Sequence, residues 1–174
     1  MTGPATVTAE AFEALYRRTS PEVLGFLRRR VGDEAPDLLA DVYVLAWEKR
    51  DKLPAEWLRR AWLFGMARRL LLSHSRQTSR DAAAEVGAAL LASQPPHEPE
   101  QSVGATVRAA LMRLAEIDRE LIQLTEWEQL SITEAAVATG LKPGTARVRL
   151  HRARTRLAQD PELAALVTTT AIPR

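Results

Sequence analysis

The stretch LSITEAAVATGLKPGTARVRLHRARTRL, residues 130–157, carries the signals of two short helices joined by a tight connection. Ser131 followed three residues later by Glu134 forms a capping box, in which each side chain satisfies a free backbone N–H at a helix start. Gly140 tolerates the positive φ that ends such a helix, and Pro143 suits the first turn of the next one, where no N–H donor is needed. The stretch therefore predicts a helix-turn-helix.

The second helix of this pair is predicted to be strongly basic on its outer side. Ala146, Leu150, Ala153 and Leu157 recur at helical spacing and form one apolar stripe. The positions between 144 and 157 also include five arginines and one histidine, and no acid. A charged helix face is most often merely solvated, and an αα-hairpin is a common structure. The capping box, glycine turn, proline start and basic face together favour a helix that lies in the major groove of DNA, where guanidinium groups bind phosphates and guanine edges.

The composition of the chain favours an all-α protein. Of its 174 residues, 46% are hydrophobic and only 5% are aromatic. Ala, Leu, Glu and Arg are frequent, and most of these residues lose little rotamer freedom in a helix. The formal net charge is only +2, but the charges are segregated, because six acids and a single arginine lie between residues 116 and 134, directly before the basic helix. This distribution indicates a polyanionic partner more strongly than the net charge does.

Several classes of protein are excluded by what the sequence lacks. There is no cysteine, and the three histidines lie far apart without carboxylates at metal spacing, so we expect no metal and no cofactor. No arrangement of nucleophile, base and paired carboxylates is recognisable, so we expect no enzyme. The sequence shows neither a signal peptide nor an uncharged apolar run of about 18 residues, which predicts a cytoplasmic protein without membrane insertion.

Apolar periodicity divides the chain into two parts. It predicts helices over 9–18 and 21–31, a third from residue 36 and a fourth over 55–76. The segment 78–101 is rich in small residues and ends in a proline cluster, which is typical of a linker. We therefore expect two small helical domains joined by a flexible linker, the C-terminal one a helix-turn-helix. The expected boundaries are 1–77 and 106–158 for the domains, 78–105 for the linker and 159–174 for a C-terminal tail.

From Leu114 to Leu157 the sequence resembles region 4 of the extracytoplasmic-function group of bacterial sigma factors. Leu114 lies where the family has Leu-Pro, and Arg119 and Glu120 lie where it has Arg-Glu. Residues 128–131 match its acidic-Gly-Leu-Ser motif. Residues 144–154 match its motif Gly-Thr-Val-Arg-Ser-Arg-Leu-x-Arg-Ala-Arg. Two positions differ from the pattern. Lys142 stands where a serine usually caps the recognition helix, and Val148 stands where serine is usual.

The N-terminal part independently resembles region 2 of the same family. DLLADVYVLAW, residues 37–47, lies where the family has Asp-Leu-x-Gln-Glu-x-Phe-x-x-Ala-Trp, with Ala40 in place of glutamine. RAWLFGMARRLLLSHSRQ, residues 60–77, lies where it has Trp-Leu-x-x-Ile-Ala-x-Asn followed by basic residues, with Arg69 in place of asparagine. Because two different segments match one family in the right order, across a linker of suitable length, the resemblance covers the chain as a whole.

The resemblance implies an alternative sigma factor, which is not an enzyme by itself. Such a protein binds core RNA polymerase and directs promoter-specific transcription initiation. Its C-terminal domain recognises the −35 element, and its N-terminal domain melts and reads the −10 element. By motif position, the residues expected at the −35 element are Lys142, Thr145, Arg147, Val148, Arg149, His151 and Arg152. Within this set, the resemblance implies phosphate contacts for Lys142, Thr145 and Arg149.

The resemblance implies two further sites in the N-terminal domain. The family docks its Asp-Leu-x-Gln-Glu segment on the clamp helices of the largest polymerase subunit, and the matching positions are Asp37, Leu38, Ala40 and Asp41. The fourth predicted helix is basic with interleaved aromatics, as single-strand-binding surfaces are. The residues expected to contact the −10 element are Trp57, Arg59, Arg60, Arg68, Arg69 and Arg76. The loop 49–59 is expected to be the main reader of the −10 sequence. Many members of the group are held inactive by an anti-sigma protein, so the expected partners are core RNA polymerase, promoter DNA and an anti-sigma factor.

The alternative function is a stand-alone helix-turn-helix regulator that binds duplex DNA without polymerase. Such a regulator needs a ligand pocket or a dimer face in its N-terminal domain. A sigma factor instead needs Asp37, Asp41 and the basic, aromatic fourth helix there. An enzyme, such as a helical hydrolase, is a second alternative, but no catalytic constellation for it appears in the sequence. A sigma-like adaptor that binds polymerase but no longer opens DNA is a third alternative.

Overall fold

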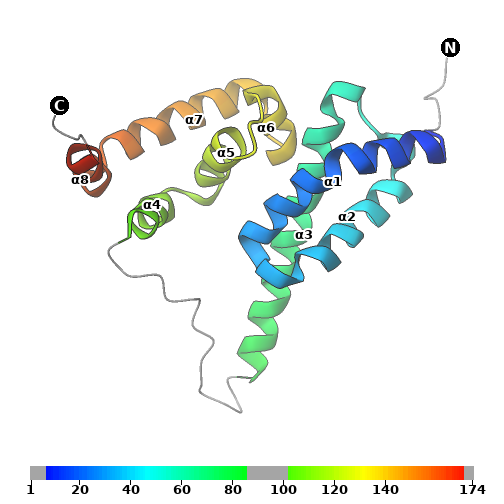
Figure 1. Ribbon diagram of the computed structural model, residues 1–174, viewed down its shortest axis with the longest axis horizontal. Helices are drawn as coiled ribbons and strands as arrows, with labels where there is room; N and C mark the ends of the chain where they lie inside the picture. Colours follow the sequence, from blue (N-terminus) through cyan, green and yellow to red (C-terminus); the bar gives the residue numbers. More distant parts are fainter. Residues whose placement is uncertain (1–6, 86–101, 171–174) are drawn as a thin grey trace.

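The computed structural model describes residues 7–85 and 102–170, and within them every long element is an α-helix. Figure 1 shows two groups of helices that lie side by side. The first group holds α1 (Ala9–Val31), α2 (Ala35–Glu48) and α3 (Glu56–Glu85), with the short 3-10 turns Gly32–Glu34 and Arg50–Lys52 between them. The second holds α4 (Val103–Met112), α5 (Glu116–Glu126), α6 (Ile132–Thr139), α7 (Pro143–Ala158) and α8 (Pro161–Thr170). The all-α architecture with two small helical domains is therefore confirmed.

Aromatic and aliphatic side chains form the core of the N-terminal domain. Phe26 of α1 and Phe64 of α3 are fully buried and meet edge to face, with their ring centroids 5.2 Å apart. Tyr43 of α2 is also buried, and its hydroxyl shares a hydrogen bond of 2.7 Å with the hydroxyl of Thr19. Burial raises the pKa of Tyr43 to about 12. These contacts tie α1, α2 and α3 to one another.

The structure corrects the prediction of a break before Pro21. The sequence pattern predicted two helices, but α1 runs without interruption from Ala9 to Val31 with Pro21 inside it. An internal proline costs about 3 kcal/mol because it removes one backbone hydrogen bond and crowds the preceding turn. Leu15 and Val23, on either side of it, are both buried in the core. Packing of this apolar face against α2 and α3 keeps the helix continuous.

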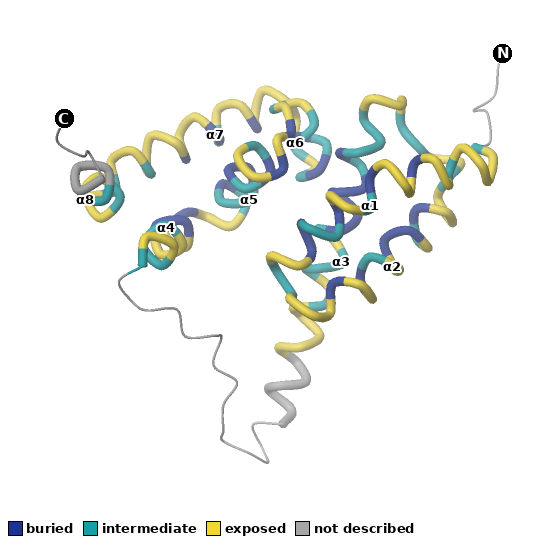
Figure 2. Tube along the Cα trace, viewed as in Figure 1, coloured by how far each residue is buried: buried dark blue, intermediate teal, exposed yellow. Residues whose placement is uncertain are grey.

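The third helix is also longer than the pattern indicated. It was expected to end near Arg76, but α3 continues to Glu85, into the segment expected to be linker. Figure 2 shows that residues 75–79 of α3 are exposed, in contrast to the buried part near α6. Residues 86–101, which contain most of the expected linker, lie outside the described residues.

The helix-turn-helix predicted from residues 130–157 is present in the C-terminal domain. Ser131 and Glu134 form the capping box at the start of α6, and Gly140 adopts a left-handed conformation with φ of 72° at its end. The apolar stripe of α7 faces inward, with Ala146, Leu150 and Ala153 buried. Lys142 caps α7 without a side-chain hydrogen bond. These local signals are confirmed.

The C-terminal tail folds in part into α8, which packs against α4. Asp160 joins the two helices, because one carboxylate oxygen accepts hydrogen bonds from the backbone N–H groups of Glu162 and Leu163. Its other oxygen binds the Arg113 guanidinium at 2.6 Å. These hydrogen bonds lower the pKa of Asp160. The tail therefore holds α4 in place from its outer side.

Replacing Ser131 by alanine is expected to destabilise the C-terminal domain by about 1 kcal/mol. The substitution removes the side-chain acceptor of the Glu134 backbone N–H and one partner of its carboxylate. Urea unfolding followed by circular dichroism would measure the change. Ser73→Ala, on an exposed part of α3, is the matched control and should leave the free energy of unfolding almost unchanged. Equal effects for the two variants would show that the capping box does not contribute.

Candidate nucleic-acid and protein interfaces

The outer face of α7 is an open basic surface. Of the residues expected to contact the −35 element, Lys142, Thr145, Arg147, His151 and Arg152 are exposed. Val148 is 48% exposed and lies among them. In the part of the chain that the structure describes, the side chains of Arg147, His151 and Arg152 form no ion pair. Their donors are therefore available to a ligand outside the molecule.

Several of these residues border a shallow hollow between α7 and the start of α5. Its volume is about 670 Å³. Thr145, Val148, Arg149 and Arg152 of α7 line it, together with Asp118 of α5. The structure thus brings four of the seven expected −35 residues to one concave surface. A concave cationic surface of this kind fits a phosphate backbone beside a groove.

Arg149 differs from its neighbours because it has a partner inside the domain. Its guanidinium donates to Asp118 at 2.8 Å, and Arg156 lies 3.9 Å from the other carboxylate oxygen. Asp118 is only 6% exposed. This pair fixes α7 on α5, so Arg149 has a structural task in addition to the DNA contact expected of it. Arg154 is likewise paired, with Glu126 at 2.6 Å.

Helix α2 presents a face with two acidic and two apolar residues. Asp37, Ala40 and Asp41 are exposed and share one side of the helix, since they are three and four residues apart. Val44 continues this side and is 57% exposed. Leu38 differs from these residues because it is 7% exposed and packs in the core. Its expected contact with core RNA polymerase stays a prediction. Leu38 supports this face from beneath.

The six residues expected at the −10 element fall into different environments. Trp57, at the start of α3, is 63% exposed, and Arg69 and Arg76 also face solvent. Arg59 donates to the carbonyl of Pro54 at the end of the preceding loop. Arg60 and Arg68 are engaged by the C-terminal domain. The Arg60 guanidinium donates to the Glu128 carbonyl oxygen at 2.6 Å, and Arg68 lies 3.6 Å from the Glu116 carboxylate.

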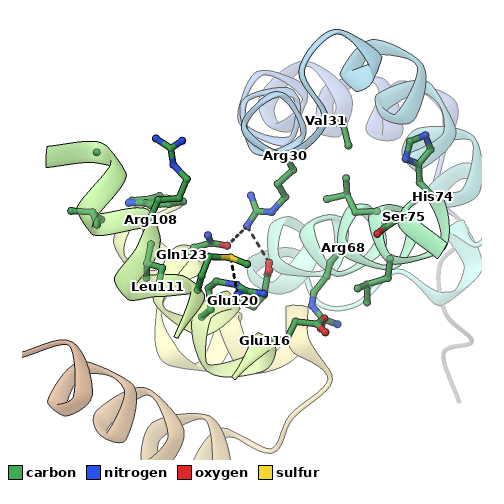
Figure 3. A pocket seen from close by; sticks show the side chains of 17 residues that line it. Arg30, Val31, Arg68, His74, Ser75, Arg108, Leu111, Glu116, Glu120 and Gln123 are labelled. Carbon is green, nitrogen blue, oxygen red and sulfur yellow. Dashed lines mark hydrogen bonds and ion pairs between the residues drawn. The ribbon is translucent and has the colours of Figure 1, made fainter. Parts of the chain in front are cut away.

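Residues of α1 and α3 from one domain and of α4 and α5 from the other line a cavity of about 710 Å³. Figure 3 shows Arg30 reaching across it to Glu120 and Gln123. Burial lowers the pKa of Arg30, against the opposing effect of Glu120 and Glu128. Arg30 and Arg68 are both paired with carboxylates of the other domain. The cavity is therefore part of the seam between the domains, and it exists only while they are in contact.

Sequence analysis missed the residues that hold this seam together. Arg29 and Arg30 end α1, and they bind Glu128 and Glu120 on the C-terminal domain. The run of arginines at 28–30 and the acidic segment 116–134 were visible signals of charge. Nothing in the sequence spacing indicated that the two would meet.

Two family models match the chain, one on each domain. The model described as Sigma-70 region 2 matches residues 15–81, and the model described as Sigma-70, region 4 matches residues 105–157. Together they cover more than half of the chain. The protein therefore belongs to the sigma-70 family of RNA polymerase sigma factors.

Curated relatives place it in the extracytoplasmic-function group. It is 33% identical to RNA polymerase sigma factor CarQ of Myxococcus xanthus over 148 residues, which cover 82% of this chain and 84% of the relative. It is 29% identical to the ECF RNA polymerase sigma factor RpoE of Cereibacter sphaeroides, over 86% of this chain and 85% of the relative. The chain is an alternative sigma factor that directs promoter-specific transcription initiation.

Solved structures share the arrangement of helices. The sigma factor RpoE from Bartonella quintana, in a complex with the anti-sigma factor NepR, matches with a TM-score of 0.64 and 27% identity, over 87% of this chain and 96% of that one. CnrH in complex with the cytosolic domain of CnrY has the same fold, with a TM-score of 0.59 at 24% identity. Among the helices described, none is both long and apolar enough to cross a bilayer.

Proposed function

We propose that the C-terminal domain reads the −35 element with the outer face of α7. The expected contacts are Lys142, Thr145, Arg147, Val148, Arg149, His151 and Arg152. The observation that carries this proposal is the open cationic face of α7, on which the described part of the chain offers no internal partner to Arg147 or Arg152. Arginine forks bind guanine edges bidentately, and the same groups bind phosphates.

The N-terminal domain is proposed to contact polymerase and the −10 element with different surfaces. The exposed acidic face of α2, with Asp37, Ala40 and Asp41, docks on core RNA polymerase, and Val44 adds an apolar contact. Trp57 and the arginines at 59, 60, 68, 69 and 76 of α3 hold the −10 strand. An aromatic platform beside cationic side chains binds unpaired bases through stacking and phosphates through charge.

The protein is proposed to act in the cytoplasm and without catalytic chemistry of its own. The described residues contain no group of histidines and acids that could hold a metal ion. An anti-sigma factor is proposed as a third partner beside polymerase and DNA. It is supported by the likeness to the Bartonella quintana sigma factor, whose structure holds the anti-sigma factor NepR. A pull-down from cells that yields no inhibitor would contradict this partner.

Transcription in vitro with core RNA polymerase tests the whole proposal. Promoter-dependent transcripts that appear only when the protein is added are the expected result. Binding to duplex DNA without initiation would instead identify the stand-alone regulator. Binding to polymerase without strand opening would identify the adaptor.

Neutralising Asp37 and Asp41 together is expected to weaken binding to core RNA polymerase about tenfold. The double variant Asp37→Asn, Asp41→Asn keeps the shape of both side chains and removes the charge that favours a basic docking surface. Interferometry with immobilised core enzyme would measure the affinity at two salt concentrations. The matched control is Glu10→Gln with Glu13→Gln on exposed positions of α1. An equal loss in the control would show that net charge, and not the face of α2, determines binding.

A further inference from the structure

Val148 places an apolar side chain on the otherwise polar outer face of α7. It is 48% exposed, although the helix is described over its whole length and has a core side for apolar residues. Leu150 is almost fully buried on that side, and Leu157 packs partly against the core. Val148 does not belong to this core, so its two methyl groups are available to a ligand outside the molecule.

The stability of α7 does not explain a valine at this position. A β-branched side chain loses rotamer freedom in a helix, and an exposed one recovers little of that loss through burial. Valine and serine have similar helix propensities, so serine would serve the fold equally well here. The residue type is therefore open to an explanation by what α7 contacts.

The nearest side chains on the same face of the helix are polar. Thr145, Val148 and Arg152 are spaced three and four residues apart, which places them in one strip along α7. All three line the hollow of about 670 Å³ between α7 and the start of α5. A base edge that faces this strip meets an apolar group in the middle, with a hydroxyl on one side and a guanidinium on the other.

The position of this strip is fixed from within the domain. Arg149, the residue after Val148, donates to Asp118 of α5 at 2.8 Å, and Arg156 approaches the same carboxylate. Asp118 is only 6% exposed, and the two cations offset its charge. The hollow therefore keeps its cationic character, and Val148 is held in a defined place before any ligand binds.

The bases of a duplex differ in what they can offer to such a side chain. In the major groove, thymine carries a methyl group on carbon C5, whereas adenine and guanine present only polar atoms at their edges. Valine has no donor and no acceptor, so a polar base edge that loses water against it gains no hydrogen bond in return. Cytosine acquires the same methyl group when its C5 is methylated.

We propose that Val148 makes one position of the −35 element specific for a base with a C5 methyl group, thymine or methylated cytosine. The methyl groups of the side chain and the base exclude water from each other, while Arg147 and Arg152 hold the neighbouring phosphates and base edges. The inference rests on the proposed −35 role of α7, and it adds the chemical group that this helix recognises.

A single substitution removes the apolar contact without disturbing the fold. Val148→Ser deletes both methyl groups at an exposed position, so the free energy of unfolding should hardly change. The matched control is Val103→Ser, because Val103 of α4 is also exposed, at 61%, and lies outside the proposed DNA surface. Circular dichroism verifies that both variants are folded.

The recognised position is found by selection from a duplex library. The full chain in complex with core RNA polymerase is offered promoter duplexes whose −35 region is randomised. For the unmodified protein and the Val103→Ser control, we expect one position at which thymine is strongly preferred. With Val148→Ser this preference should disappear, while the preferences at the other positions remain.

Exchange of thymine for uracil then removes the methyl group and nothing else from the selected duplex. We expect this exchange to weaken binding by about fourfold at the recognised position, as the loss of one buried methyl group predicts. The Val103→Ser control should lose the same factor, and Val148→Ser should lose nothing. The inference is overturned if uracil is tolerated at every thymine, or if Val148→Ser shows the same loss as the unmodified protein.

A cytosine probe distinguishes the two sources of the methyl group. With cytosine at the recognised position, the unmodified protein should bind more weakly than with thymine, and methylation of C5 should recover about fourfold. Val148→Ser should not respond to this methylation. Because the two methyl groups occupy the same place in the groove, the absence of a gain with the unmodified protein would also contradict the inference.

Transcription by the unmodified protein separates this inference from the function on which it rests. If the complex initiates from promoters with a defined −35 sequence but does not respond to the methyl group, only the role of Val148 is wrong. If neither initiation nor a −35 preference is observed, the proposed function fails, and the inference fails with it.

Discussion

Replacement of Arg147 and Arg152 by alanine is expected to reduce binding to the −35 duplex by about 100-fold or more. Each arginine that binds a base edge or phosphate contributes about 1–3 kcal/mol, and the two side chains lie on the open face of α7. Their removal should also make binding less sensitive to salt, by about one unit of the logarithmic slope for each phosphate that the protein no longer neutralises. Fluorescence anisotropy over a range of salt concentrations would measure both quantities. Promoter-dependent transcription should fall in parallel.

A second pair of arginines on the same helix provides the control. Arg154 and Arg156 carry the same charge but are paired with Glu126 and Asp118 inside the domain. Alanine at both positions changes the net charge of the protein by the same amount. We expect the affinity to fall much less than in the first double variant. If both double variants lose affinity equally, α7 binds through its overall charge and not through a defined face.

The helix-turn-helix was predictable because its signals are local. Ser131, Gly140 and Pro143 each satisfy a backbone requirement at one helix end, and no distant residue is needed to meet it. The same reasoning failed at Pro21, where a local signal for a helix start was outweighed by tertiary contacts. Leu15 and Val23 hold one continuous helix in the core on both sides of the proline. Local rules therefore succeed where packing agrees with them.

The exposed and the paired arginines could not be distinguished from the sequence. Arg147 and Arg149 lie two residues apart in the same motif, yet Arg149 is bound to Asp118. On α3, Arg68 is engaged by the other domain while the adjacent Arg69 is exposed. Helical periodicity gives the direction of a side chain but not what it meets there. The residue assignments for the −35, −10 and polymerase sites therefore stay predictions.

The contact between the domains is the feature of the structure that was least predictable from the sequence. Its residues are distant along the chain, as in the pairing of Arg29 with Glu128, and they belong to two domains that were expected to be joined by a flexible linker. Charge segregation was visible at residues 116–134, but it was interpreted only in relation to an external polyanion. The same charges bind arginines inside the molecule. An acidic segment beside a DNA-binding helix thus has two candidate partners, and only the structure identifies the internal one.

Phe64→Ala is expected to lower the free energy of unfolding of the N-terminal domain by about 3–5 kcal/mol. Phe64 is fully buried, and its edge-to-face contact with Phe26 adds to the loss of apolar burial. A domain of this size has a total stability of about 5–15 kcal/mol, so the variant approaches the limit of folding. Urea unfolding monitored by circular dichroism would measure the change. A decrease below about 1 kcal/mol would mean that the core repacks around the cavity.

Trp57→Ala is the matched control for this stability effect. It also truncates an aromatic side chain of α3, but Trp57 is 63% exposed and should leave the free energy of unfolding within about 0.5 kcal/mol of its original value. The contrast also tests how the domains depend on each other. Because α3 carries both Phe64 and Gly65, which lies against the Ala138 backbone of α6, disruption of the core should release α6 as well. In the Phe64→Ala variant, the distribution of distances between the domains, measured with a spin label on each, should therefore broaden at a lower urea concentration than the one at which the helices of the C-terminal domain unfold.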